Sequence, residues 1–452
     1  NVSHQTWYHE FSHHFLQFLR DVFKPSADKK LLIVCGDKTR LPFIKILNNI
    51  LNAAGVGVSI CQLSSKDKTC SLDAFLNTCQ DYFAVLECIT PLGPLSLTKR
   101  QLYWIASVDQ MPIEKIALDC PSGLNPDTGH FISEQAVSVN YTLASFYYLK
   151  GLWTGLSKAF IGQPILFWDA AINDKKVAFK ARLMHESQMR SLMPIRPPFA
   201  HKGCFKRVVV IAGDAEMFGA AFMAAKAALL MGAGLVEVLL PAGVNPPYAQ
   251  LPEVIWHVLS SGFEVQDYLH DEDIVILGPG LDHGAWAGAI WDIVKQRTSP
   301  VVLDASGLAF LALEPMMRPN WIITPHPGEA AKLLSCSNHD VQKNRFDAIN
   351  RLYALYGATT VLKGCGTLVL GENEETYICP LGHAGMATPG MGDVLSGLIA
   401  GLWAQHLSGV QAAMLGVWLH AYAAEKAARQ SLNAIAIASE VLSQIQHGLG
   451  CE

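Results

Sequence analysis

A glycine-rich turn leads into a long apolar segment at Gly390-Met391-Gly392-Asp393-Val394-Leu395. From residue 394 to residue 424 the chain has no Asp, Glu, Lys or Arg, and such a segment is long enough to cross a bilayer. Polar residues interrupt it near residues 405–411, so we expect two helices, at about residues 394–405 and 410–428. A helix that is apolar on all sides can form the buried centre of a large α/β protein, and we predict this core position rather than a membrane span.

Short apolar runs alternate with helical patterns before this segment. A first group of predicted strands comprises residues 31–36, 56–63, 83–89 and 115–118, with a helix at 41–54. A second group comprises residues 208–212, 235–240, 273–277, 301–303, 321–324, 359–362 and 367–370, with a helix at 219–231. The strand–helix–strand order predicts parallel sheets with helices on both faces, so we expect an α/β protein with two doubly wound domains.

The region between the two groups has a different character. Residues 168–200 contain Pro pairs and several Lys and Arg residues without periodicity, which is typical of a domain boundary. The length of 452 residues also suggests two or three domains. We therefore predict one domain at residues 1–185 and another at residues 196–452.

Composition excludes several classes of protein. Half of the residues are hydrophobic and 16% are charged, which excludes a disordered chain. The net charge is −5 and Lys and Arg form no cluster, so we expect neither nucleic acid nor a membrane as a partner. Eleven cysteines without a C-x-x-C pair predict reduced thiols, and residues 1–20 contain no apolar stretch typical of a signal peptide, so we expect a cytoplasmic protein. The long apolar helices suggest a homo-oligomer.

The turn at residues 390–393 carries the strongest chemical signal. Two glycines let the backbone approach a ligand, and the N–H groups at a helix start form a cradle for an anion. An aspartate at that position makes sense as a base that takes a proton from a hydroxyl while the hydroxyl attacks a phosphoryl group. On these residues alone, an Asp393 that merely caps the helix is an equally good interpretation.

Four other loops follow predicted strands, and in a parallel sheet such loops meet where ligands bind. Lys363 and the Gly-x-Gly turn after it can reach nucleotide phosphates, although a β-hairpin with a surface Lys is the simpler alternative. Glu329, after Thr324-Pro325-His326-Pro327-Gly328, can hold a water bound to Mg²⁺ or can cap the next helix. The remaining two loops are Leu277-Gly278-Pro279-Gly280-Leu281 and Leu303-Asp304-Ala305-Ser306-Gly307.

On these loops the second region resembles the ribokinase-like NAD(P)H-hydrate dehydratases, from about His201 to the end of the chain. In bacteria these enzymes often follow an NAD(P)H-hydrate epimerase domain, which agrees with the two-part layout. The resemblance implies that ADP or ATP phosphorylates the hydroxyl of hydrated NADH or NADPH, and that elimination of the phosphate regenerates the cofactor. A small-molecule kinase of the same fold and a non-catalytic nucleotide-sensing protein remain alternatives.

The resemblance also implies roles for particular residues. Asp393 would be the base, and the backbone of Gly390, Met391 and Gly392 would form the anion hole. The nucleotide would bind Gly392 and the loop Lys363, Gly364, Cys365, Gly366 and Thr367. The hydrate would contact Ala220, Gly280, His326 and Asp393. Mg²⁺ would bridge the phosphates, with Glu329 in its outer shell.

Three positions in this region depart from the family's pattern. Pro389 lacks an N–H, so we expect one donor fewer in the anion hole. Asp282 adds a carboxylate that would repel phosphates unless it points away, and His383 replaces a usual Asn.

The first region resembles the epimerase domain less closely. The loops 118–129 and 150–155 match, and imply that Asp119 contacts the hydrate and that Ser122 helps to hold K⁺. The loop at 35–42 lacks the Gly and Asn residues of the family's phosphate-binding run, and Glu87 replaces a usual Asp. We therefore predict an impaired or inactive epimerase half.

A second metal pattern lies near the start of the chain. His9-Glu10-Phe11-Ser12-His13 fits the H-E-x-x-H pattern of zinc proteases, but it falls in a predicted amphipathic helix without a downstream third ligand. We interpret it as a chance match.

Overall fold

The computed structural model describes residues 4–26, 28–36, 38–62, 77–91, 93, 96–145, 147–167, 181–214 and 216–447. The chain divides into two compact units, unit 1 at Asn1–Ala178 and unit 2 at Phe179–Glu452. Much of the predicted boundary segment, including Lys175, Lys176 and Lys180, lies outside the described residues.

Unit 1 is built on a six-stranded parallel sheet with the strand order β2-β1-β3-β4-β5-β6. The strands are β1 (Lys30–Cys35), β2 (Val58–Gln62), β3 (Tyr82–Cys88), β4 (Glu114–Leu118), β5 (Tyr141–Ala144) and β6 (Gln163–Leu166). The helices are α1 (His4–Val22), α2 (Leu41–Ala53) and α4 (Lys99–Asp109).

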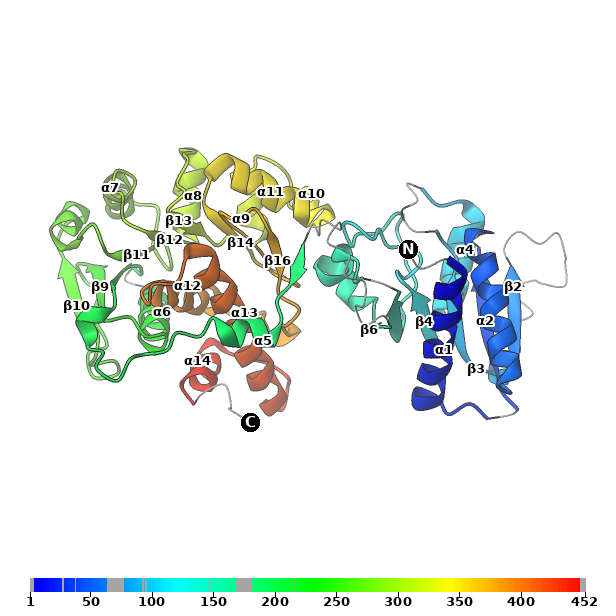
Figure 1. Ribbon diagram of the computed structural model, residues 1–452. Coiled ribbons are helices and arrows are strands. Elements are labelled where there is room, and N and C mark those ends of the chain that lie inside the picture. The colour runs from blue at the N-terminus through cyan, green and yellow to red at the C-terminus, as the bar shows by residue number, and fades with distance from the viewer. Residues whose placement is uncertain are drawn as a thin grey trace. The chain divides into compact units, whose positions relative to one another are not determined.

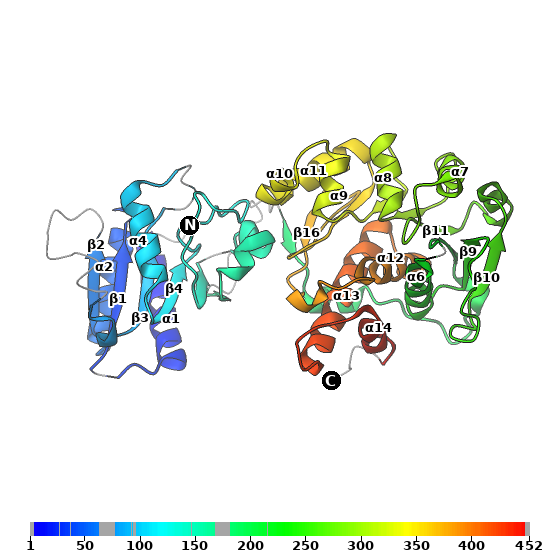
Figure 2. The ribbon, with the colours of Figure 1, turned by 180° about the vertical axis from the view of Figure 1, so that it is seen from behind.

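Helices cover both faces of this sheet, with α1 and α2 on one face and α4 on the other (Figures 1 and 2). Side chains of β1 alternate between the two cores: Leu31 and Ile33 pack with α1 and α2, while Leu32 and Val34 pack with α4. This two-sided burial explains why the strand is apolar at every position from Leu31 to Cys35.

Unit 2 contains a ten-stranded sheet with the order β10-β9-β8-β11-β12-β13-β14-β15-β16-β7. The strands are β7 (Arg182–Leu183), β8 (Arg207–Ile211), β9 (Leu235–Pro241), β10 (Ile255–Leu259), β11 (Ile274–Leu277), β12 (Val301–Leu303), β13 (Trp321–Ile323), β14 (Thr359–Leu362), β15 (Leu368–Leu370) and β16 (Thr376–Ile378). Neighbouring strands are parallel except at β14–β15 and β15–β16, where the connections are too short for a crossover. The two doubly wound α/β units expected from the sequence are confirmed.

The helices of unit 2 form two layers. α6 (Phe218–Leu230), α12 (Met391–Trp403) and α13 (Gly409–Gln430) share one core with the sheet. On the opposite face the Trp291 ring of α7 packs against Trp321 of β13. The other helices are α5 (Glu186–Ser191), α7 (Ala285–Val294), α8 (Ser306–Leu313), α9 (Pro327–Leu333), α10 (Asn338–Lys343), α11 (Arg345–Tyr356) and α14 (Ala438–Gln446).

The predicted pair of core helices is confirmed as α12 and α13. Gly397 and Gly401 let α12 lie directly against α6, because a Cβ on them would come within 2.2 Å of the Ala224 carbonyl oxygen and 2.5 Å of the Ala228 carbonyl oxygen. No helix in the described part of the chain is long and apolar enough to cross a membrane.

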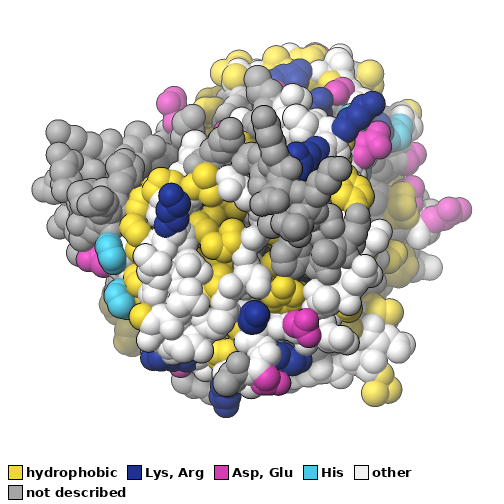
Figure 3. All heavy atoms as spheres, turned by 90° about the vertical axis from the view of Figure 1, so that its right-hand side faces the viewer, with side chains coloured by type: hydrophobic (Ala, Val, Ile, Leu, Met, Phe, Trp, Pro, Cys, Tyr) yellow, Lys and Arg dark blue, Asp and Glu magenta, His cyan; other side chains and the backbone are white. Residues whose placement is uncertain are grey.

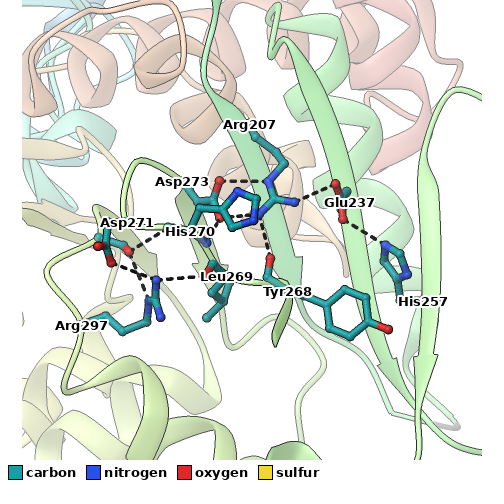
Figure 4. A network of polar contacts seen from close by, with 10 residues as sticks. Arg207, Glu237, His257, Tyr268, Leu269, His270, Asp271, Asp273 and Arg297 are labelled. Atoms are coloured by element: carbon teal, nitrogen blue, oxygen red, sulfur yellow. Dashed lines mark hydrogen bonds and ion pairs between the residues drawn. The ribbon is translucent and has the colours of Figure 1, made fainter. Parts of the chain in front are cut away.

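A polar network links four strands of unit 2, β8, β9, β10 and β11, near their amino ends (Figure 4). Arg207, at the start of β8, donates to both carboxylate oxygens of Asp273, at 2.9 and 2.6 Å, and to Glu237 at 2.8 Å. Glu237 also contacts the ring of His257 at 2.9 Å. Because these groups lie at the end of the sheet opposite to the strand-end loops, the network serves the fold rather than a site there.

On the face of the molecule in Figure 3, Lys and Arg side chains are interspersed with Asp and Glu side chains and with hydrophobic and uncharged ones. The described residues on this face therefore form no continuous basic patch.

Candidate functional site

The start of α12 brings backbone and acid together at the carboxyl edge of the sheet. Gly390 precedes the helix with a φ of 87°, and a Cβ there would lie 2.5 Å from the Met223 sulfur. The left-handed conformation favours glycine, and a side chain here would also have to displace Met223. Gly392 is in the first turn, where its α-carbon faces Asp304 and Lys363: an added Cβ would lie 3.2 Å from Asp304 Oδ2 and 3.4 Å from Lys363 Nζ.

Asp304 and Lys363 form the buried ion pair of this site. Asp304 follows β12 and Lys363 follows β14, and Lys363 Nζ donates to Asp304 Oδ1 at 2.7 Å. Ser396 of α12 donates to the other oxygen of Asp304 at 3.1 Å. Burial alone would raise the pKa of Asp304, but the charge and hydrogen bond of Lys363 hold it below its usual value.

Lys363 is also held from a second side. Its Nζ lies 3.8 Å from Glu329 Oε2. Burial would lower the pKa of Lys363, and the charges of Asp304 and Glu329 raise it instead, so the amine stays protonated. The turn after β14 joins two antiparallel strands as a β-hairpin, but its lysine is only 19% exposed and is directed at Asp304 and Glu329 rather than at solvent.

Asp393 stands apart from this pair. Within the described part of the chain its carboxylate accepts no hydrogen bond and forms no ion pair, so it does not cap α12. Burial raises its pKa, the negative charge of Asp304 adds to the effect, and Lys363 opposes it, with a net pKa of about 6. A carboxylate with these properties is ionised at neutral pH and is still basic enough to accept a proton.

The loop after β13 forms the start of α9. His326 Nδ1 accepts the N–H of Gly328 at 3.0 Å, and Glu329 Oε2 accepts the N–H of His326 at 2.7 Å. Of the two roles predicted for Glu329, the helix cap is therefore present, and the same carboxylate also faces Lys363.

A cavity of about 260 Å³ opens beside this loop. Its lining consists of His283, Ala305, Ser306, Leu308, Ala309, His326, Glu329 and Lys332. Ala305 has a φ of 46°, a strained conformation for alanine that immediately follows Asp304. Strain of this kind is typical of functional sites.

Two other predicted substrate residues, Ala220 in the first turn of α6 and Gly280 in the loop after β11, lie together. Gly280 has a φ of 62°, and a Cβ on it would be 2.9 Å from the Cβ of Ala220. Gly213 N donates to the Pro279 carbonyl at 2.8 Å, so the loops after β8 and β11 are joined. The structure thereby places Ala220 and Gly280 side by side.

A buried arginine holds the start of the predicted nucleotide loop through hydrogen bonds to its backbone. Gly364 and Gly366 have φ values of 129° and 62°. Arg345, at the start of α11, is 1% exposed and donates to the carbonyl oxygens of Leu362 and Lys363 at 3.0 and 3.1 Å. Thr367 and Cys365 lie on the outer part of the turn, where Thr367 Oγ1 donates to the Gly364 carbonyl and Cys365 is exposed.

Two of the three departures from the family's pattern have a local structural role. Asp282 Oδ1 accepts the N–H of Gly284 at 3.0 Å, so its carboxylate is directed at its own loop. His383 Nδ1 accepts the N–H of Gly385 at 3.0 Å and caps the next turn, which an Asn can also do. Pro389 precedes Gly390 and has no N–H to offer.

Asp119 and Ser122 belong to unit 1 and form a separate group. Asp119 has a φ of 66°, and its Oδ1 accepts the N–H of Ser145 at 2.9 Å. The Ser122 N–H donates to Glu87 Oε1 at 2.7 Å, and Ser122 Oγ accepts the N–H of Thr90 at 3.1 Å. Asp37, in the altered loop after β1, lies outside the described residues.

The H-E-x-x-H pattern lies on the exposed side of α1, where His9, Glu10 and His13 are all exposed. No group of three or more His, Cys, Asp or Glu side chains within the described ranges is arranged to hold a metal ion.

Asp304 is the residue whose role the sequence did not reveal. In the sequence, Asp304 was noted only as part of the loop Leu303-Asp304-Ala305-Ser306-Gly307 after a predicted strand. The available signal was its position directly after a buried strand of the same sheet as Lys363.

Comparisons with known proteins show the family to which the chain belongs. The family model described as NAD(P)H-hydrate dehydratase matches residues 208–447. The bifunctional NAD(P)H-hydrate repair enzyme Nnr of Coxiella burnetii is 41% identical over 335 residues, which cover 72% of this chain and 67% of the relative. The corresponding Escherichia coli enzyme is 36% identical, covering 74% and 65%. These alignments are longer than unit 2, so they include part of unit 1, and the chain spans about two thirds of these relatives.

A solved dehydratase structure is also similar to this chain over a length close to that of unit 2. The ADP/ATP-dependent NAD(P)H-hydrate dehydratase of Bacillus subtilis, co-crystallised with ATP and Mg²⁺, is 26% identical, with a TM-score of 0.54 over 60% of this chain and 98% of that chain. The ADP-dependent (S)-NAD(P)H-hydrate dehydratase of Neisseria meningitidis is 40% identical over 50% of this chain and 78% of its own length.

Proposed function

This chain belongs to the NAD(P)H-hydrate dehydratase family, and we propose that unit 2 uses ADP or ATP to return the S form of hydrated NADH or NADPH to the intact cofactor. The observation that carries the proposal is Asp393: a partly buried carboxylate without a partner among the described residues, with a pKa of about 6, at the start of a core helix and beside a fixed lysine.

The first step is transfer of a phosphoryl group to the ring hydroxyl. Asp393 accepts the hydroxyl proton as the oxygen attacks the terminal phosphorus, and the bond to the leaving nucleotide oxygen breaks. The backbone N–H groups at the start of α12 and the helix dipole stabilise the charge that develops on the phosphoryl oxygens.

The second step is elimination. The carbon–oxygen bond to the new phosphate breaks with the electron pair leaving on phosphate, the ring nitrogen supplies the electrons, and loss of a ring proton restores the double bond. Phosphorylation is needed because hydroxide is a poor leaving group and phosphate is a good one. The reaction neither oxidises nor reduces the cofactor.

Lys363, Glu329 and Asp304 define the charge of the phosphate end of the site. Lys363 is held by Asp304 and braced through the Arg345 contacts, so it presents a fixed positive charge rather than a mobile arm. Among these residues, Glu329 is the one that would contact Mg²⁺. Because its Oε2 already accepts the N–H of His326, contact with the ion through a water molecule is favoured over direct coordination. When bound with the nucleotide, Mg²⁺ would neutralise phosphate charge.

The test compares substrates and products. The purified chain is incubated with S-hydrate and ADP or ATP, and both nicotinamide absorbance and inorganic phosphate are measured. Equal yields of reduced cofactor and phosphate support the dehydratase. A stable phosphorylated product without recovery of the cofactor would instead show a small-molecule kinase of the same fold.

We also make a proposal for where the protein acts and how it assembles. We expect the protein to act in the cytoplasm and to assemble into a homo-oligomer. The apolar helices that suggested assembly, α12 and α13, are buried in the core of unit 2 and give no surface for it. Light scattering of the purified chain decides whether another surface does.

A further inference from the structure

After β1 in unit 1, the guanidinium group of Arg40 lies at the carboxyl end of the sheet. Arg40 stands at the N-cap position of α2, but its side chain makes no capping bond there. Instead Nη1 donates to the Leu118 carbonyl at the end of β4, at 3.1 Å, and Nη2 lies 3.7 Å from Asp119 Oδ2. The Arg40 side chain is only 12% exposed.

Two acids lie at the same edge: Asp119 contacts the guanidinium, and Glu87 is close enough for its charge to act on it. Asp119 is 18% exposed in its side chain, and Glu87, at the end of β3, is 1% exposed. Burial raises the pKa of Glu87, while hydrogen bonds from Ser122 and Ile89 and the charge of Arg40 act against that rise. Burial would lower the pKa of Arg40, but Cys88, Asp119 and Glu87 raise it. The arginine is therefore a permanent cation next to these acids.

Neither acid is free to change its position. Ser122 N donates to Glu87 Oε1 at 2.7 Å, and Ser145 N donates to Asp119 Oδ1 at 2.9 Å. Gly36 holds the β1 end directly against β3, because a Cβ on it would lie 2.1 Å from the Ile89 carbonyl oxygen. The positions of both carboxyl groups are thus fixed by the fold, and any negative charge that they carry so far from solvent needs a cation close by.

We propose that Arg40 is the built-in counter-ion of Glu87 and Asp119, and that it occupies the position at this edge that a bound monovalent cation would need. Three features carry this: the guanidinium is nearly covered, it is anchored to the Leu118 carbonyl, and it faces the Asp119 oxygen that Ser145 leaves open. An ordinary surface pair would leave both side chains largely exposed and would contribute little.

The proposal has two consequences for unit 1. Its stability should not depend on K⁺, because the protein supplies the positive charge itself. The Asp119 carboxylate is engaged by Arg40 and Ser145 rather than available to a ligand hydroxyl. Neither consequence depends on the activity of unit 2.

The test measures the response of the full chain to cations. Thermal unfolding and hydrogen exchange at the Ser122 and Ser145 amides are followed in KCl, NaCl and choline chloride at equal ionic strength. Variants are Arg40→Ala, Arg40→Lys and, as a matched control, Arg100→Ala, whose side chain is exposed on α4. Hydrogen exchange confines the readout to unit 1.

The expected pattern is specific. For the native chain, Arg100→Ala and Arg40→Lys, the melting temperature and the hydrogen-exchange rates of each protein do not change between the three salts. Arg40→Ala melts several degrees lower and exchanges faster at both amides, and K⁺ restores part of each loss with saturation. If Arg40→Ala does not fold, the native chain and Arg40→Lys still test the proposal. Saturable stabilisation of the native chain by K⁺ would overturn it. So would an Arg40→Ala variant that folds and is indifferent to every salt.

Discussion

Both units place acids and a basic side chain in contact with them at the carboxyl ends of a sheet, but the pairing differs. In unit 2, Lys363 binds Asp304 at 2.7 Å, and Asp393 has no partner among the described residues. In unit 1, Arg40 faces Asp119 itself, the acid that the family resemblance assigns to the substrate. The comparison teaches that it matters which carboxylate the cation pairs with, because a nearby cation lowers the pKa of that carboxylate and makes it a weaker base.

The largest expected effect comes from removing the unpaired acid. Asp393→Asn should lower kcat by about 10²–10⁴-fold, the usual range for a general base. The fold should survive because Asp393 makes no hydrogen bond or ion pair within the described residues. Initial rates of cofactor recovery with S-hydrate and ADP measure the effect.

Asp282→Asn is the matched control for this variant. Asp282 lies in another strand-end loop, and its amide replacement can still accept the Gly284 N–H. Its rate should equal that of the native chain. Full turnover by Asp393→Asn would remove Asp393 as the base and return the kinase-like and non-catalytic interpretations to consideration.

The second prediction concerns the space between α12 and the ion pair. Gly392→Ala would put a methyl group 3.2 Å from Asp304 Oδ2 and 3.4 Å from Lys363 Nζ. We expect the ion pair or the helix start to shift, with a loss of up to about 10²-fold in kcat/KM. Gly288→Ala, in α7, is the control because its Cβ meets nothing within 4 Å. Equal activity of the two variants would show that close approach at Gly392 is not needed.

The third prediction uses pH. With a pKa of about 6 for Asp393, kcat/KM should rise with pH through about 6 and level off above 7, because only the ionised form accepts a proton. The charge of Asp304 raises that pKa, so Asp304→Asn should move the midpoint to lower pH as well as reduce the rate. A role of Asp304 that is only structural would lower the rate without moving the midpoint.

The fourth prediction concerns the opposite edge of the same sheet. Arg207→Met leaves the buried carboxylates of Asp273 and Glu237 without their cation, which should cost about 3 kcal/mol in the free energy of unfolding of unit 2. At temperatures where the unit stays folded, kcat should be unchanged. Arg429→Met is the control, because its pair with Glu425 is exposed and contributes at most about 0.5 kcal/mol. Chemical denaturation of the full chain measures both.

Much of the fold follows from local pattern. Val301–Leu303 and Thr359–Leu362 have the bounds predicted from the sequence, since buried strands are short apolar runs between turns. β10 at Ile255–Leu259 escaped prediction because it lies at the sheet edge and contains the polar His257, with Ile255 and Val258 exposed. The strand β16 (Thr376–Ile378) was not predicted either, so its antiparallel pairing with β15 was also missed.

The site was less predictable than the fold. Gly390, Gly392 and Asp393 stood out because glycines at a helix start allow the backbone to approach an anion, and a carboxylate beside them is unusual. Three other residues did not stand out: Asp304, Ser396 and Arg345. Asp304 matters through its contacts with Lys363, 59 positions away, and with Ser396, 92 positions away. Arg345 matters through its hydrogen bond to the Leu362 carbonyl at the end of β14. Periodicity and composition carry no information on such pairings.

The smallest expected effect completes the comparison between the units. In unit 1 the Gly and Asn residues of the phosphate-binding run are absent, and Arg40 and Ser145 already engage Asp119. The full chain without nucleotide should therefore convert R-hydrate to the S form no faster than the uncatalysed background, and Asp119→Asn should change nothing. The Escherichia coli relative serves as the positive control in the same assay. Rapid conversion that Asp119→Asn abolishes would show that a carboxylate facing an internal arginine can still work as an acid–base group, and would break the connection between pairing and activity.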